Sequence, residues 1–247
     1  MSLVSIILPT FNSAQFISQT INSIISQTYS NWELIITDDC SSDDTTSIIE
    51  TFRVKDARIE LFKLKSNSGS GNARNNSIKH AKGRYIAFCD SDDQWMPHKL
   101  KKQISFMRDK DVAFTYTSYD VINEDGDFQK TIDCPKTITY NELLRNNYIG
   151  CLTVMYDAAK LGKMYMSEIR KRQDWVLWFE ILKKTQIGYG IEESLALYRL
   201  RSNAISAKKL KLIKYNWRIY RIELKYSWLC SLLLIINFML YYIKKKI

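Results

Sequence analysis

The stretch that decides the fold is Tyr85-Ile86-Ala87-Phe88-Cys89-Asp90-Ser91-Asp92-Asp93, in which a short apolar run leads into three acidic residues. The run after Gly83 is β-prone and is typical of a buried strand. Carboxylates crowded at the exit of such a strand repel one another unless a cation lies among them. A divalent ion held by one or two carboxylates, with positions left open for diphosphate oxygens, is common in nucleotide chemistry. The alternative is an acidic turn that caps the helix opened by Pro97.

On both sides of this stretch, apolar runs of strand length alternate with helical patterns. Pro9 is expected to end the first strand, Asn12 or Ser13 to cap the first helix, and Asp43 or Asp44 to begin the second helix. Such alternation predicts an α/β fold with a mostly parallel central sheet and helices on both faces. Besides the strand over 85–88, we expect strands over 4–8, 34–36 and 59–64, and helices over 16–25, 44–52, 71–81 and 100–107.

Polar clusters follow three of these strands, at residues 9–12, 38–44 and 90–93. In open parallel sheets, ligands bind beyond the carboxyl ends of the strands. One cluster could arise by chance, but three at equivalent points of the topology indicate a common binding site.

Several of these segments resemble the family 2 glycosyltransferases of GT-A fold. The similar segments are 5–12 (S-I-I-L-P-T-F-N), 24–29 (I-I-S-Q-T-Y) and 33–39 (E-L-I-I-T-D-D). Residues 67–75 (N-S-G-S-G-N-A-R-N) resemble that family's N-x-G-x-x-x-A-R-N segment, and 90–92 match its D-x-D element. The resemblance runs from about residue 4 to 108 without a gap, and it implies a nucleotide-diphospho-sugar transferase.

The resemblance also implies roles for individual residues in this half. Asp39 would accept hydrogen bonds from the base or ribose of the donor, as a charge-assisted acceptor. Asp92 would bind Mg²⁺ or Mn²⁺, and Asp90 would touch the ribose or share the metal, which neutralises the diphosphate leaving group. Arg74 would add positive charge near the phosphates, or alternatively lie on a solvated helix face. The expected donor-binding residues are Pro9, Thr10, Asn12, Asp39, Asn67, Arg74, Asp90 and Ser91.

In the second half, Gln173-Asp174-Trp175 opens a predicted helix. In the family that this chain resembles, an acidic pair followed by an aromatic residue opens this helix, and its second acid is the catalytic base. Here Gln173 occupies the first position and Asp174 keeps the second, so Asp174 is the predicted base. Inverting transfer needs one carboxylate to take the proton of the acceptor hydroxyl. The alternative is that Asp174 only caps the helix.

The segment 198–206 departs from the family at one position. It resembles a Y-R-x-H element, but Arg201 stands where the histidine is expected. Arginine can contact a phosphate but cannot ligate a metal ion, which bears on the metal dependence. The two histidines, His80 and His98, have no ligand partner at a suitable spacing, so a zinc site is not expected.

Residues 208–247 carry nearly all of the net positive charge. The chain has a formal charge of +10, and this tail contains ten Lys or Arg residues and one acid, Glu223. The rest of the chain is therefore almost neutral, which argues against a nucleic-acid partner. A basic stripe and an apolar stripe adjoin on the predicted helix over 210–225. The basic stripe is Lys211, Lys214, Arg218, Arg221 and Lys225, and the apolar stripe is Leu210, Ile213, Trp217, Tyr220 and Leu224.

After these stripes the tail becomes apolar on all faces. Residues 226–243 give 18 helical residues, close to the shortest length that crosses a bilayer, before the lysines at 244–246. We expect this tail to attach to an anionic membrane surface, either peripherally or by a single C-terminal anchor. The alternative is a helix packed on the catalytic domain or on a second protomer.

Together these patterns predict a GT-A domain over 1–207, with donor binding in 1–108 and acceptor binding in 109–207, followed by a helical tail over 208–247. The predicted activity is inverting transfer of a hexosyl or related group from a nucleotide-diphosphate sugar to a hydroxyl. The acceptor is expected to be a lipid-linked glycan of a surface polysaccharide, at the cytoplasmic face of the plasma membrane.

The odd number of widely spaced cysteines is typical of reduced thiols, and the first strand is too short for a signal peptide. One alternative is a noncatalytic, membrane-bound scaffold that binds nucleotide sugars. Another is a nucleotidyltransferase, which would need a basic, glycine-rich phosphate loop that residues 9–12 do not supply.

Overall fold

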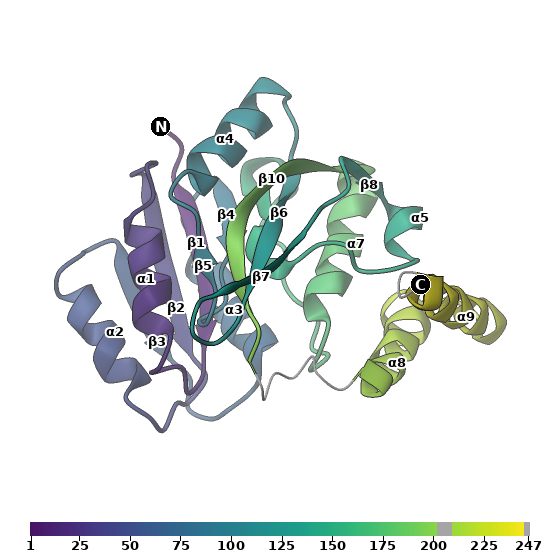
Figure 1. Cartoon of the computed structure of the whole chain (residues 1–247), viewed down its shortest axis with the longest axis horizontal. Coiled ribbons are helices and arrows are strands. Elements are labelled where there is room, and N and C mark those ends of the chain that lie inside the picture. Colours follow the sequence, from purple (N-terminus) through teal and green to yellow (C-terminus); the bar gives the residue numbers. More distant parts are fainter. Residues whose placement is uncertain (202–208, 245–247) are drawn as a thin grey trace.

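The N-terminal half follows the predicted alternation of strands and helices (Figure 1). In the computed structural model, which describes residues 1–201 and 209–244, strands β3, β2, β1 and β4 are neighbours in that order and pair in parallel. Their carboxyl ends therefore meet at one edge of the sheet. The elements are β1 (Val4–Thr10), α1 (Ile17–Ile25), β2 (Trp32–Asp38), α2 (Thr45–Arg53), β3 (Ile59–Lys63), α3 (Ser70–His80), β4 (Tyr85–Phe88), β5 (Gln94–Trp95) and α4 (Lys99–Asp109).

Strand β1 does not end at Pro9, as the sequence predicted, but continues to Thr10. Pro9 is tolerated in β1 because the neighbouring strand β4 ends before it. The pairing of β1 with β4 ends at Ile7 and Phe88, so no strand lies beside Pro9 on that side to require a hydrogen-bond donor. On the other side, β2 remains paired as far as Asp38, opposite Thr10.

One predicted cap is wrong, and the alternative role of the acidic turn as a cap is excluded. The N-cap of α1 is Phe16, without a side-chain cap bond, and Ser13 contributes only its carbonyl oxygen, to the N–H groups of Phe16 and Ile17. The acidic turn does not cap α4, whose N-cap is His98, because β5 separates the turn from the helix. For α2 the prediction is confirmed, since Asp44 is its N-cap.

The C-terminal half makes the sheet mixed rather than wholly parallel. Strand β9 enters antiparallel between β4 and β6, and β10 pairs in parallel with β6. The β6–β7 hairpin turns at Asp125-Gly126, where Gly126 has φ 99°. The elements are β6 (Phe114–Ile122), β7 (Phe128–Ile132), β8 (Thr137–Thr139), α5 (Tyr140–Leu143), η1 (Cys151–Thr153), β9 (Met155–Asp157), α6 (Ala158–Leu161), α7 (Gln173–Thr185) and β10 (Ile187–Arg199).

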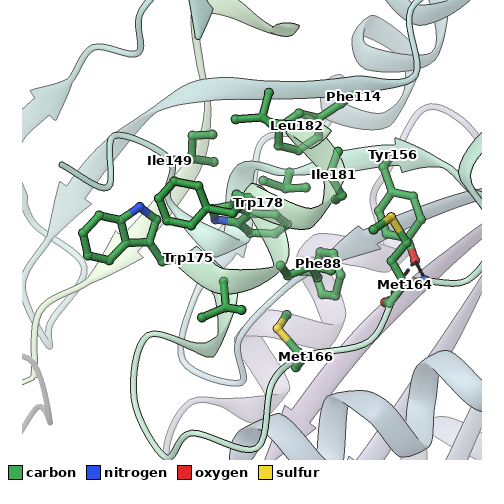
Figure 2. Close-up of a cluster of buried hydrophobic side chains, with 14 of the residues drawn as sticks. Phe88, Phe114, Ile149, Tyr156, Met164, Met166, Trp175, Trp178, Ile181 and Leu182 are labelled. Atoms are coloured by element: carbon green, nitrogen blue, oxygen red, sulfur yellow. Dashed lines mark hydrogen bonds between the residues drawn. The ribbon is translucent and has the colours of Figure 1, made fainter. Parts of the chain in front are cut away.

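Alternating side chains of β1 enter two hydrophobic cores, one on each face of the sheet. Ile6 and Leu8 join the core under α1, α2 and α4, whereas Ile7 joins the core under α3 and α7. The second core surrounds Trp178 of α7, whose ring centroid lies 5.8 Å from those of both Phe88 and Phe114 (Figure 2). Helix α7 is therefore fixed against the end of β4, and this brings its first turn toward the acidic loop.

The C-terminal tail is a helical pair that lies beside α7, away from α1 and α2 (Figure 1). It comprises α8 (Lys209–Arg218), the π-helical turn η3 (Ile219–Glu223) and α9 (Trp228–Lys244). The predicted apolar helix from Tyr226 is wrong at its start, because the chain turns at Lys225, with φ 58°, and α9 begins at Trp228. Across residues 1–201 and 209–244, no helix combines the length and apolar character needed to span a bilayer.

One face of the tail packs on the rest of the chain. Tyr220 and Ile235 are buried in the core that contains α7, and the Tyr220 hydroxyl donates to the Leu144 carbonyl at 2.8 Å. The opposite face exposes an apolar strip, made of Trp228, Leu229, Leu233, Ile236, Met239 and Leu240. The predicted positions 202–208 and 245–247, and the side chains of Leu210 and Lys211, lie outside the described residues.

Candidate active site

The acidic loop after β4 lies between two arginines. Asp90 accepts a bond of 2.5 Å from Nη2 of Arg74, which reaches it from α3 and is only 6 % exposed. Asp92 lies 3.6 Å from Nη1 of Arg201. Burial, together with the negative charge of Asp90, raises the pKa of Asp92 above its ordinary value. The loop is therefore crowded with negative charge that the two arginines offset only in part.

A buried arginine that the sequence analysis did not single out holds this loop in shape. Arg199, at the end of β10, donates from Nε to the Asp92 carbonyl at 3.0 Å and from Nη2 to Gln19 at 2.7 Å. Its backbone N–H donates to the Asp93 carboxylate at 3.0 Å, and Asp93 is 1 % exposed with its second oxygen unbonded among the described residues. The signal was present in the Tyr198-Arg199 pair, which the sequence analysis quoted without giving Arg199 a role.

The ends of β1 and β2 meet the loop before α3. The Asp39 carboxylate accepts from the backbone N–H groups of Ser68 at 2.7 Å and Gly69 at 2.8 Å. The Asp39 N–H donates to the Thr10 carbonyl at 2.8 Å, while the buried Thr10 hydroxyl has no hydrogen-bond partner among the described residues. Asp39 therefore fixes the 67–69 loop, and its oxygens are already engaged in this structure.

The remaining predicted donor residues frame the same edge of the sheet. Asn12 has a left-handed backbone, with φ 46°, and its Oδ1 accepts from the Ser42 N–H at 2.9 Å. The Asn67 Nδ2 donates to the Asp39 carbonyl at 3.3 Å. The Ser91 hydroxyl is buried and lies 2.7 Å from the Ser13 hydroxyl, so it ties the acidic loop to the segment after β1. Pro9 and Thr10 end β1, and Arg74 reaches the same edge of the sheet from α3. The loops at this edge carry Asn12, Asp39, Asn67, Asp90 and Ser91.

Asp174 lies half-buried in the first turn of α7, and this turn docks on α3. Nε2 of Gln173 donates to the Ser70 hydroxyl at 2.8 Å. Burial raises the pKa of Asp174, whereas the positive charge of Arg74 opposes this rise and Asp90 adds to it. Arg74 and Asp90 thus both influence the charge state of Asp174. The N-cap of α7 is Arg172, so Asp174 is not the capping residue.

A cysteine that no sequence pattern indicated, Cys151, interacts electrostatically with the same three residues. Burial raises the pKa of the Cys151 thiol well above its ordinary range, with Arg74 opposing and Asp90 and Asp174 reinforcing the rise. Cys151 opens the short helix η1 and has no sequence spacing to another reactive residue that could have revealed it. Helix η1 contacts β4, the strand whose exit carries the acidic loop.

The acidic loop fits a divalent cation that is completed by phosphate oxygens rather than a closed protein cage. No three His, Cys, Asp or Glu side chains converge to hold a metal within the part of the chain described. Mg²⁺ is usually bound by one or two carboxylates together with waters and substrate phosphates. Asp92 is partly exposed at 24 % and adjoins the like charge of Asp90, so the donor set present suits that mode of binding.

Comparison with known proteins gives consistent results. The family model described as glycosyl transferase family 2 matches residues 5–167. The putative teichuronic acid biosynthesis glycosyltransferase TuaG of Bacillus subtilis is 44 % identical over 220 residues, which are 89 % of this chain and 87 % of the relative. The UDP-Glc:α-D-GlcNAc-diphosphoundecaprenol β-1,3-glucosyltransferase WfgD of Escherichia coli is 41 % identical over 88 % of this chain and 85 % of the relative.

A solved structure of similar shape is that of S. aureus TarS residues 1–349 in complex with UDP-GlcNAc. It superposes with a TM-score of 0.76 at 21 % identity, covering 97 % of this chain and 72 % of the other. At this identity, the likeness shows a shared fold. The mixed α/β sheet described above is therefore the fold of a known GT-A transferase, as the sequence predicted.

Proposed function

Because this chain belongs to glycosyl transferase family 2 and is a glycosyltransferase, we propose that it transfers a sugar, with inversion, from a nucleotide-diphosphate sugar to a lipid-linked glycan. The observation that carries the proposal is the position of Arg74, which pairs with Asp90 and also acts electrostatically on Asp174. A donor phosphate group near Asp90 and an acceptor hydroxyl near Asp174 would then lie on opposite sides of one buried cation.

The donor would bind across the ends of β1, β2 and β4. Thr10 offers a buried hydroxyl without a partner, and Arg74 has a buried Nε without one among the described residues. Buried polar groups of this kind are costly unless something bonds to them, and a bound donor can do so. The Asp39 carboxylate already accepts bonds from the N–H groups of Ser68 and Gly69. Each of its oxygens has a further lone pair, which would accept a bond from the base or ribose. Pro9, Asn12, Asn67 and Ser91 would shape the rest of this pocket.

A divalent ion, Mg²⁺ or Mn²⁺, would be held by Asp92, with Asp90 as its second carboxylate ligand. Such an ion stabilises the negative charge of the diphosphate leaving group. Arg201 lies at 3.6 Å from Asp92 and Arg74 at 2.5 Å from Asp90, so each carboxylate already faces a cation of the chain. These arginines would stabilise the negative charge of the leaving group together with the metal. The reaction would therefore depend less on the metal.

Asp174 would act as the base that removes the proton of the acceptor hydroxyl. A carboxyl whose pKa is raised is a stronger base than an ordinary aspartate, provided that it remains ionised at the working pH. Asn147 supports its orientation, because the Asn147 Nδ2 lies 3.4 Å from the Asp174 Oδ2. Inversion follows from this assignment, since a single base on the acceptor side directs attack opposite to the leaving group.

The acceptor proposal extends to this chain the undecaprenyl-diphosphate-linked acceptor named for WfgD. The tail supports it, because the apolar strip on α9 is exposed while Lys214, Arg218 and Lys225 are exposed close by in sequence. An apolar face with adjoining lysines and arginines fits an anionic membrane surface. The proposed arrangement is a catalytic domain over 1–207, with a donor half over 1–108, held peripherally by 208–247 at the cytoplasmic face of the plasma membrane.

The test is calorimetric titration of UDP-, GDP- and dTDP-sugars into the purified chain, with and without Mn²⁺, followed by transfer assays with a lipid-linked acceptor. The proposal expects one nucleotide class to bind and to be consumed. Binding without any turnover would instead support a noncatalytic scaffold, and release of pyrophosphate from a nucleoside triphosphate would support a nucleotidyltransferase.

A further inference from the structure

Just before the proposed base, Asp174, the chain carries a run of three basic residues, Arg170-Lys171-Arg172. Arg172, the N-cap of α7, adopts a left-handed backbone with φ 61° and ψ 25°, which is uncommon for a residue other than glycine. This conformation reverses the chain just before Gln173 and Asp174. The Arg172 side chain lies against Phe238 of the tail, whereas the next residue, Gln173, bonds to Ser70 of α3.

The guanidinium group of Arg172 is enclosed but not satisfied. Its carbon lies 5.1 Å from the ring centroid of Trp175 and 5.4 Å from that of Phe238 in α9. Its Nη1 is buried and has no hydrogen-bond partner among the described residues. Burial lowers the pKa of Arg172, and Asp174 opposes this effect. A buried, charged donor that lacks an acceptor is a place where an anion would be stabilised.

The other two members of the run extend this positive region in opposite directions. Nζ of Lys171 lies 5.7 Å from the ring centroid of Tyr215 in α8. Nη2 of Arg170 donates to Oδ1 of Asn67, in the loop that Asp39 holds, at 3.3 Å. The run therefore reaches from the donor loop to the two tail helices, with Arg172 between Asp174 and α9.

We propose that Lys171 and Arg172 form a second anion site, which binds the diphosphate of a lipid-diphosphate-linked acceptor between Asp174 and the apolar strip. The inference deepens the proposed function and rests on it. The planar fork of arginine suits bidentate contact with phosphate oxygens, and it also stacks on aromatic rings, as Arg172 does here.

The order of these groups in space matches the order of groups along such an acceptor. The apolar strip of α9 would contact the prenyl chain, Arg172 and Lys171 the diphosphate, and Asp174 the hydroxyl of the first sugar. Phe238, on the packed face of the same helix, covers Arg172, so the prenyl chain would pass around α9 from the diphosphate to the apolar strip. The diphosphate of the donor would bind elsewhere, at Arg74 and Arg201 of the acidic loop.

The test is calorimetry on the full chain with its donor pocket saturated by the nucleoside diphosphate that binds in the donor screen. Geranyl diphosphate, geraniol and inorganic pyrophosphate are the probes. The variants are Arg172→Gly, which suits the left-handed backbone, Arg172→Lys, which keeps the charge, and Lys183→Gln, which removes an exposed cation at the far end of α7.

We expect Arg172→Gly to weaken geranyl diphosphate binding about tenfold or more, as for loss of a charged hydrogen bond. Arg172→Lys should retain most of the affinity, and Lys183→Gln should leave it unchanged. Geraniol should bind more weakly than geranyl diphosphate to every variant, and substitution of Arg172 should not change its affinity. If Arg172→Gly fails to fold by circular dichroism, Lys171→Gln tests the same site and should weaken binding in the same direction.

Equal binding of geranyl diphosphate to wild type and to the folded charge-removing variant would overturn the inference. If pyrophosphate binds as tightly as geranyl diphosphate and loses as much affinity in Arg172→Gly, the site binds free anions. That result would overturn the proposal of a lipid-linked ligand. Donor binding and donor hydrolysis, measured on the same proteins, separate this failure from failure of the proposed function. If the wild-type protein neither binds nor hydrolyses a donor, the proposed function itself is refuted.

Discussion

The sharpest prediction concerns Asp174→Asn, because asparagine keeps the shape of the side chain and removes its basicity and negative charge. The residue is half-buried, and Arg74 and Arg172 stabilise its charge. General base catalysis contributes roughly 10²–10⁴-fold to a rate, so the variant should lose that factor in transfer, equivalent to about 2.7–5.4 kcal/mol in the barrier. Donor affinity should stay within about twofold of wild type, a change of less than roughly 0.5 kcal/mol.

The assay is a radiolabelled transfer measurement, with calorimetry for donor binding, repeated as a function of pH. Because burial raises the pKa of Asp174, the base becomes protonated at a higher pH than an ordinary aspartate. Activity should therefore fall on the acid side at a higher pH than usual, and this limb should disappear in Asp174→Asn. Glu180→Gln is the matched control, since it changes an exposed acid on the same helix and should leave the profile intact. Transfer by Asp174→Asn within fivefold of wild type would refute the assignment.

Three further changes test other parts of the account. Arg201→Ala should tighten Mn²⁺ binding by up to about fivefold in calorimetry, because a partly exposed cation at 3.6 Å no longer competes for Asp92; weaker binding would contradict this. Burial lowers the pKa of Lys99 from 10.5 to about 7, so between these values the unfolded chain binds the extra proton and stability should rise with pH. Urea unfolding should show this rise in wild type and a flatter profile in Lys99→Met. Gly190→Ala should cost about 1–3 kcal/mol in the same urea assay, because its Cβ would lie 2.1 Å from the Pro135 carbonyl oxygen; unchanged stability would be inconsistent with the packing.

The parts of the fold that could be predicted are those written in local patterns. The apolar run ending at Phe88 and the acids after it identified β4 and its loop, because buried strands and polar exits differ in composition over a few residues. The same alternation gave the parallel half of the sheet. Pro9 was misjudged, since whether a strand tolerates proline depends on whether its neighbour continues, and that neighbour lies about 80 residues further along the chain.

The site shows the same division. Asp90 and Asp92 stand at the exit of a buried strand, where position indicates a binding site, whereas the role of Asp174 was predicted from the family resemblance. Arg199 and Cys151 were missed because their importance comes from contacts with loops distant in sequence, which no periodicity records. In the tail, the apolar and basic stripes were visible, but the turn at Lys225 was not, because a left-handed lysine has no compositional signature.

The central claim is that one carboxylate, Asp174, activates the acceptor opposite to a leaving group held at Asp90 and Asp92. Proton NMR of the first product formed by purified enzyme, with a donor of known anomeric configuration, tests it most directly. The account predicts that the new glycosidic bond has the opposite configuration to the donor. A product with the donor's configuration retained would require a different catalytic arrangement and would contradict the account.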